Sequence, residues 1–70
     1  MNMSEQKLTV KSKTAKVAQL LLNNRPYGVL KKDAVAVITE HLGKTTLGLA
    51  NGSTITVQQD LESVSKVFGL

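Results

Sequence analysis

The sequence predicts a small α+β domain in which three helices accompany a short three-stranded antiparallel sheet, in the order β-α-α-β-β-α. Residues 7–12 alternate apolar and polar side chains, which is typical of a strand. Three later segments space their apolar residues three or four positions apart, which is typical of helices. At 70 residues the chain has room for one domain, expected over residues 7–70 after a disordered N-terminus over residues 1–6.

The first two predicted elements are a strand and a helix. KLTVKS, residues 7–12, sets its leucine and valine on one side and its lysines on the other, as expected for an exposed edge strand. In TAKVAQLLLNN, residues 14–24, Ala15, Ala18 and Leu22 fall on one helical face. The asparagines and the Arg-Pro pair that follow are expected to end this helix.

A second helix is predicted over KKDAVAVITEHLG, residues 31–43. Its apolar stripe includes Ile38 and Leu42, and Gly43 is a suitable residue to end a helix. The β-branched residues in VAVI also suit a strand, but the polar residues Thr39 and Glu40 argue against a strand continuing there.

The last helix is predicted to begin at Val57 and to end at Gly69. Thr56 is a suitable N-cap, and Gln59 follows it at the spacing of a capping box. The apolar face of this helix consists of Val57, Leu61, Val64 and Phe68.

Between the last two helices, TTLGLANGSTITV predicts a hairpin whose register can be deduced. A two-residue turn at Asn51-Gly52 would place leucines opposite threonines, whereas a three-residue loop over residues 50–52 pairs Leu47 with Ile55. That loop also puts Gly52 where a left-handed residue is needed. Gly48 marks either a close approach of another segment or a simple exposed glycine. The two predicted faces are Leu47, Leu49, Ile55 and Val57 on one side, and Thr46, Gly48, Thr54 and Thr56 on the other.

Charge is unevenly distributed along the chain. Residues 1–32 carry seven basic side chains and one acid, Glu5, a net of +6, whereas residues 33–70 carry two basic and four acidic side chains, a net of −2. This asymmetry favours a polyanionic partner such as DNA, with an acidic protein surface or a merely solvated basic face as alternatives. Tyr27 either stacks on a base or a ribose or covers the edge of the core. The candidate nucleic-acid-binding residues are Lys11, Lys13, Lys16, Arg25, Tyr27, Lys31 and Lys32, with Gln58 and Gln59 as candidate base readers.

TVQQDLESVSKVFGL resembles the recognition helix of winged helix-turn-helix DNA-binding regulators. The matching residues are Thr56, Val57, Asp60, Leu61, Gly69 and Leu70. ITEHLG, residues 38–43, is similar to the preceding helix of that motif, and the whole resemblance covers about residues 14–70. It implies a winged-helix-like fold and DNA binding in transcription regulation. The chain departs from the family where about a dozen residues replace the tight turn after Gly43, and where glutamines replace arginines.

No catalytic motif is present, and we expect a protein that is not an enzyme and needs no cofactor. Because the chain has no cysteine and one histidine, no metal site is expected. No apolar run approaches the roughly 20 residues that span a bilayer, and no signal peptide is recognisable, so we expect a cytoplasmic protein without a membrane partner.

The predicted function is that of a small DNA-binding regulatory protein that contacts the phosphate backbone through its basic N-terminal half. The alternative is a protein-binding adaptor or inhibitor that docks on an acidic partner surface. A homo-oligomer is a further possibility, with the threonine-rich sheet face or an exposed apolar stripe as its interface.

Overall fold

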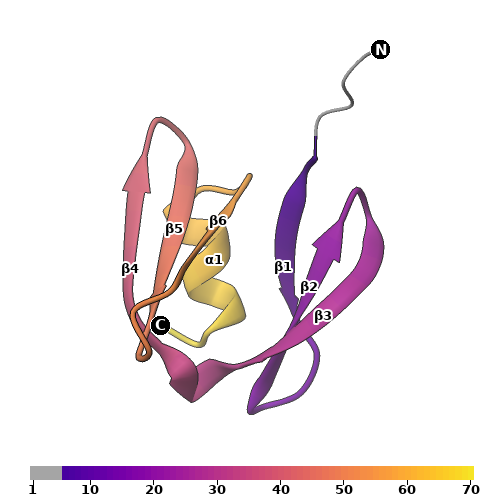
Figure 1. Cartoon of the computed structure of the whole chain (residues 1–70), viewed down its shortest axis with the longest axis vertical. Coiled ribbons are helices and arrows are strands. Elements are labelled where there is room, and N and C mark those ends of the chain that lie inside the picture. The colour runs from indigo at the N-terminus through magenta and orange to yellow at the C-terminus, as the bar shows by residue number, and fades with distance from the viewer. Residues whose placement is uncertain (1–5) are drawn as a thin grey trace.

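The computed structural model describes residues 6–70, which form two three-stranded antiparallel sheets and one short α-helix (Figure 1). Apart from residue 6, the predicted disordered N-terminus lies outside the described residues. In each sheet the strands lie side by side in chain order. Sheet A consists of β1 (Leu8–Ser12), β2 (Val17–Leu22) and β3 (Arg25–Lys31). The 3-10 turn η1 (Lys32–Ala34) leads into sheet B, which consists of β4 (Val35–His41), β5 (Lys44–Leu49) and β6 (Thr54–Val57). The helix α1 spans Leu61–Val67.

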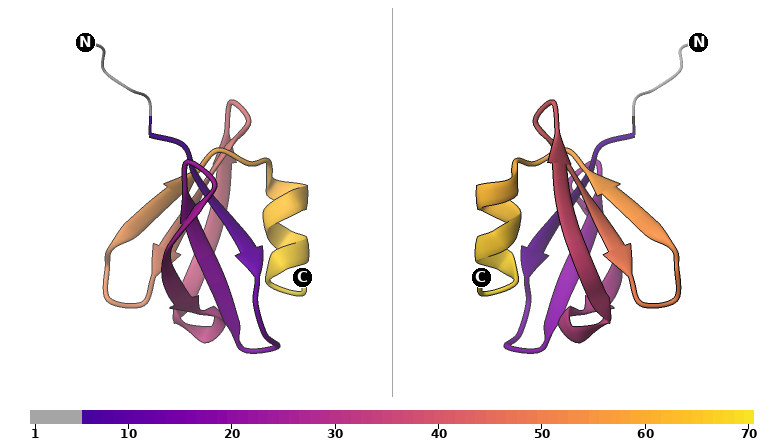
Figure 2. Two further views of the ribbon diagram at one scale, coloured as in Figure 1. Left: turned by 90° about the vertical axis from the view of Figure 1, so that its right-hand side faces the viewer. Right: turned by 90° about the vertical axis from the view of Figure 1, so that its left-hand side faces the viewer.

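The two sheets face each other, and α1 lies against them on one side (Figures 1 and 2). The helix packs against β1 of sheet A and against β4 and β5 of sheet B. Apolar side chains from all three layers meet between the sheets, and the central strands β2 and β5 bury alternate residues. The buried core consists of Val10, Ala18, Leu20 and Leu30 from sheet A, Leu47 and Val57 from sheet B, and Val64 from α1.

The predicted architecture of three helices with one sheet, and with it the winged-helix-like fold, is wrong. The first predicted helix, residues 14–24, is the loop after β1 followed by β2 and a turn. Ala18 and Leu20 face the core, two residues apart as in a strand. Because three leucines follow one another at residues 20–22, the segment also contains apolar spacings of three and four, which are those of a helix. Asn23 and Asn24 both have positive φ, 54° and 68°, as a two-residue hairpin turn requires, so the chain reverses instead of continuing a helix.

The second predicted helix, residues 31–43, is also wrong. Its first residues form η1, and the β-branched segment that follows forms β4. Leu42 and Gly43 have φ values of 55° and 79° and make a second two-residue turn, after which Lys44 pairs with His41. Gly43 therefore serves a hairpin rather than a helix end, and the preference of valine and isoleucine for strands prevails over the helical spacing.

The strand over residues 7–12 and the register of the β5–β6 hairpin are confirmed. Leu47 pairs with Ile55 and Thr45 with Val57, and Gly52 has a φ of 93° in the three-residue loop. The last helix is confirmed only in part. β6 runs on through Val57, so α1 begins at Leu61 and Asp60, not Thr56, is its N-cap.

Gly48 is a point of close approach between β4 and β5. It lies opposite Val37, and a Cβ atom at this position would overlap the Cγ1 methyl group of that valine. The pairing of β4 with β5 is also irregular here, because Ala36 is an extra residue between Val35 and Val37. Glycine at residue 48 thus leaves the room that the bulged strand needs.

Sheet A is joined to the end of sheet B by hydrogen bonds from the segment after β6. The Gln58 N–H donates to the Leu8 carbonyl at 2.8 Å, and the Gln59 side chain bonds the backbone of Val10. The Thr45 hydroxyl, which is buried, donates to the Gln59 carbonyl at 2.7 Å. These contacts join β1, the first strand of the domain, to the segment between β6 and α1.

Candidate nucleic-acid interface

The fold separates the charges of the chain between its two sheets. Of the seven basic side chains within residues 6–32, Lys7 directly precedes β1 and the other six belong to sheet A, its loops or the first residue of η1; this segment contains no acidic residue. The remaining segment, residues 33–70, carries Lys44 and Lys66 together with four acids. The asymmetry along the sequence therefore becomes an asymmetry in space.

Five lysines gather where the β1–β2 loop meets the junction of β3 and η1. We call this group the lysine-rich end, and it consists of Lys11, Lys13, Lys16, Lys31 and Lys32. Two backbone contacts hold the segments together: the Lys32 N–H donates to the Lys16 carbonyl at 2.9 Å, and Val17 pairs with Lys31 across β2 and β3. Five of the predicted site residues are thus neighbours in the folded chain.

The strand register explains why Lys11 and Lys31 face solvent. Ala18 and Leu30 are paired and buried, so the next residues, Val17 and Lys31, point to the opposite, outer face of sheet A. Lys11 belongs to the same outer face, where Gln19 separates it from the third strand.

The loop that carries Lys13 and Lys16 is held by its own side chains. The Thr14 hydroxyl accepts hydrogen bonds from the N–H groups of Lys16 at 3.3 Å and Val17 at 3.0 Å. The Lys32 Nζ donates to the Ser12 hydroxyl at 3.0 Å, which ties η1 to the same loop. Beside them lies an open hollow of about 310 Å³ lined by Ala15, Lys16, Lys32 and Asp33. The ammonium groups are therefore presented from an ordered loop, which lowers the entropy lost on binding.

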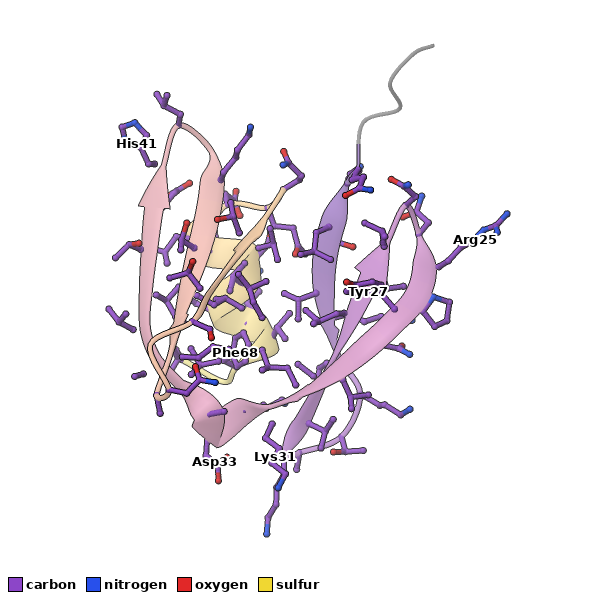
Figure 3. All side chains as sticks on the ribbon, viewed as in Figure 1. Arg25, Tyr27, Lys31, Asp33, His41 and Phe68 are labelled. Atoms are coloured by element: carbon purple, nitrogen blue, oxygen red, sulfur yellow. The ribbon has the colours of Figure 1, made fainter. Side chains whose placement is uncertain are left out.

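Arg25 and Tyr27 do not join the lysine-rich end. Figure 3 shows Arg25 and Lys31 at opposite ends of β3. Tyr27 is the extra residue of a bulge between Leu20 and Leu21 of the neighbouring strand and is 64% exposed. It is not among the residues packed on the core, so the alternative in which Tyr27 covers the core edge is not supported.

The two glutamines lie in the segment between β6 and α1, away from the lysine-rich end. The Gln58 side chain is exposed, whereas the Gln59 amide is occupied by the Val10 backbone. Next to them, the Asp60 carboxylate accepts a hydrogen bond from the Ser63 N–H at 2.9 Å, and this bond lowers the pKa of the Asp60 carboxyl. In this segment, Asp60 caps the start of α1 and Gln59 holds β1.

The prediction left out two basic residues at the opposite end of the molecule. Lys7 and Lys44 line an open hollow of about 440 Å³ together with Gln6 and Gln58. Lys7 directly precedes β1 of sheet A and Lys44 is the first residue of β5 in sheet B, so only the fold brings them together. Residue spacing alone carries no signal for such a pair.

Other kinds of site were also sought in the described part of the chain. Within residues 6–70 no three histidine, cysteine or acidic side chains come together to hold a metal ion. The only α-helix described there, α1, is seven residues long, and no helix in this range could cross a bilayer.

Comparison with known proteins adds no identity, since no protein-family model, curated protein or solved structure matches the chain.

Proposed function

We propose that this protein is a small DNA-binding protein that contacts the phosphate backbone with its lysine-rich end. The observation that carries the proposal is the charge separation between the sheets, with seven bases and no acid within residues 6–32. Phosphate contacts supply most of the affinity of binding that does not depend on base sequence, and each contact releases counterions from the DNA.

The geometry supports contacts to phosphates better than reading of bases. The five lysines extend from two loops and one outer sheet face, where flexible ammonium groups can follow a charged backbone. Base reading needs side-chain amides or guanidinium groups directed into a groove, but the Gln59 amide is already hydrogen-bonded within the protein. The proposed mode is therefore electrostatic binding with little sequence preference.

The test is a titration of labelled duplex DNA over a range of salt concentrations. If all five lysines contact phosphates, the logarithm of the association constant should fall against that of salt with a slope of about −4 to −5. The double variant Lys31→Glu/Lys32→Glu should reduce the size of this slope by about 2 and weaken binding to different sequences alike.

The matched control is Lys44→Glu/Lys66→Glu, which changes the net charge equally but lies outside sheet A. It should retain most of the affinity if the lysine-rich end is the binding surface. Equal losses in the two variants would indicate an effect of overall charge alone. Absence of a complex at low salt would overturn the proposal and favour the alternative, an acidic protein partner for the same lysines.

A further inference from the structure

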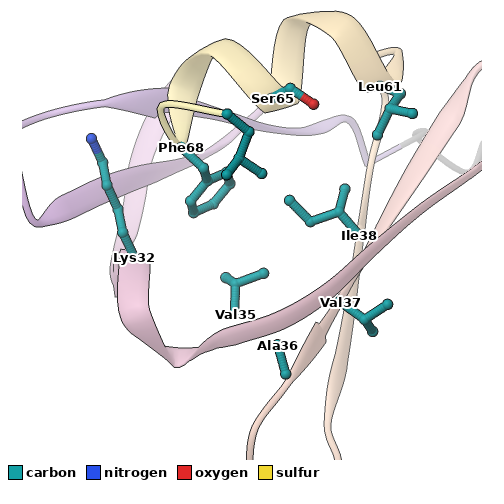
Figure 4. Close-up of a pocket in the computed structure, with 9 residues that line it drawn as sticks. Lys32, Val35, Ala36, Val37, Ile38, Leu61, Ser65 and Phe68 are labelled. Carbon is teal, nitrogen blue, oxygen red and sulfur yellow. The ribbon is translucent and has the colours of Figure 1, made fainter.

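Exposed apolar surface lies at two contrasting places in the described chain. One is the groove between β4 and α1, about 480 Å³ in volume, where Val35 and Ile38 point towards the helix (Figure 4). Lys32 is the one charged side chain in its lining. The other place is β3, where Tyr27 is 64% exposed and Val29 is 61% exposed. Of the two, β3 combines its apolar surface with positive charge on both sides.

The basic side chains of β3 lie at its two ends. Arg25 begins the strand, Lys31 ends it, and Lys32 follows directly in η1. Asp33, the first acidic residue after the strand, lies beyond both lysines in the sequence. At the usual rise per residue of a strand, Arg25 and Lys31 are roughly 20 Å apart. An anionic chain laid along β3 would therefore meet a cation at each end.

The free edge of β3 does not suit pairing with a further protein strand. Within residues 6–70 its strand neighbour is β2 alone, whereas β1, on the far side of sheet A, is held by Gln58 and Gln59. Pro26 has no N–H to donate, and the extra residue Tyr27 makes a bulge. Charged ends, a proline and a bulge are features that keep edge strands from pairing. We therefore expect an occupant of this edge to bind the side chains of β3 rather than its backbone.

The ring of Tyr27 is accessible and is flanked by cations. The other aromatic side chain of the protein, Phe68, packs against the core, whereas Tyr27 does not. Proteins hold single-stranded nucleic acid by stacking its bases on aromatic rings while basic groups follow its phosphates. The side chains of β3 therefore fit a strand whose bases are unpaired.

We propose that β3 binds single-stranded DNA, with one unpaired base stacked on Tyr27 and the neighbouring phosphates beside Arg25 and Lys31. The two basic residues lie at opposite ends of the strand, as Figure 3 shows. The inference rests on the proposed function, because sheet A also supplies the phosphate contacts of that function. It adds a ligand, the unpaired base, that backbone contact with a duplex does not involve.

The emission of Tyr27 gives a direct test in the unmodified protein. The chain has one tyrosine and no tryptophan, so tyrosine fluorescence reports on this ring alone. A short oligothymidylate should quench the emission, corrected for absorption by the DNA, in parallel with its binding measured by anisotropy of a labelled copy. A duplex of equal length should leave the emission nearly unchanged. Constant emission while the oligothymidylate binds would overturn the proposal.

Substitution of the ring tests stacking by affinity. Tyr27→Ala should weaken oligothymidylate binding at least about fivefold, whereas Tyr27→Phe keeps a ring and should stay within about twofold of the wild type. Val29→Ala is the matched control, because Val29 is similarly exposed on the same strand and has no ring. Equal losses in Tyr27→Ala and Val29→Ala would point to apolar contact without stacking and would contradict the proposal.

Duplex DNA separates the failure of this inference from that of the proposed function. Tyr27→Ala should bind a duplex as the wild type does, whereas Lys31→Glu/Lys32→Glu should weaken the binding of both forms. If the duplex binds but oligothymidylate affinity does not depend on Tyr27, this inference fails and the proposed function stands. If oligothymidylate alone binds, and does so through Tyr27, the reverse holds. Binding of neither form would overturn both.

Discussion

The side-chain amide of Gln59 pairs with the backbone of Val10 as a neighbouring strand would. Its Oε1 accepts from the Val10 N–H at 2.7 Å, and its Nε2 donates to the Val10 carbonyl at 3.0 Å. Val10 is buried, so its backbone groups have no ready access to water. One side chain thus replaces two ladder hydrogen bonds between residues that are 49 positions apart.

Removal of this amide should destabilise the whole domain. We expect Gln59→Ala to lower the free energy of unfolding by about 1–3 kcal/mol, because two backbone groups of Val10 lose their partners. Gln59→Glu should also destabilise, since it keeps an acceptor but loses the donor. Urea unfolding followed by circular dichroism measures both. Gln58→Ala is the control, as only the backbone of Gln58 is used, and it should change stability by less than about 0.5 kcal/mol. Unchanged stability of Gln59→Ala, with altered DNA preference, would instead support the base-reading role.

Gly48 should resist substitution by even the smallest side chain. Gly48→Ala is expected to cost about 1–3 kcal/mol, because the added methyl group would overlap Val37. Val37→Ala in the same chain removes the overlapping atom and should recover much of that loss. Gly28→Ala is the matched control, since no atom lies within 4 Å of a Cβ placed there. Thermal unfolding of these three variants would contradict this account if Gly28→Ala proved as costly as Gly48→Ala.

Leu42 is expected to be a site where substitution increases stability. It is 87% exposed and has a φ of 55°, a conformation in which an L side chain strains the backbone. Leu42→Gly should raise the free energy of unfolding by about 1 kcal/mol, and Leu42→Asn by less. The reverse change, Asn24→Leu in the β2–β3 turn, should destabilise by a similar amount. Denaturant midpoints that shift in the same direction for both turns would contradict the prediction.

The N-cap of α1 predicts a pH dependence of stability. The Ser63 N–H holds the pKa of the folded Asp60 carboxyl below its ordinary value, so the ionised cap stabilises the folded state. That contribution is fully present above the unfolded pKa of about 3.9 and is lost as the pH falls through the lower, folded value. Asp60→Asn keeps a capping oxygen but cannot titrate. Unfolding in urea from neutral to acidic pH should show the wild-type chain losing its advantage over this variant below about pH 4.

The sequence correctly predicts those segments whose apolar residues fit the spacing of a strand and no helical spacing. The β5–β6 register follows from the requirement that leucines share a face with Ile55 and Val57, and no helical pattern competes there. KLTVKS is similarly unambiguous. In VAQLLL and VAVITEH, apolar residues are so dense that spacings of two, three and four all occur, and pattern alone cannot separate strand from helix.

The turns contained the information that would have resolved the ambiguity. Asn23-Asn24 is a pair of residues that tolerate positive φ between two apolar runs, which is a hairpin signal rather than a helix end. Leu42-Gly43 gives a weaker signal, because leucine seldom adopts this conformation. For the candidate site, the excess of bases was visible in the sequence. The gathering of Lys16 and Lys32 was not, because it depends on the path of the β1–β2 loop.

The order of the strands has a consequence for folding kinetics. All four strand pairings join neighbours in the sequence, so the two sheets consist of local contacts that form quickly. Joining β1 to the segment after β6 requires closure of a loop between Val10 and Gln59, 49 residues apart, so we expect this contact to form last, after the transition state for folding. Substitutions at Gln59 should therefore mainly accelerate unfolding, whereas substitutions in the hairpin turns should mainly slow folding.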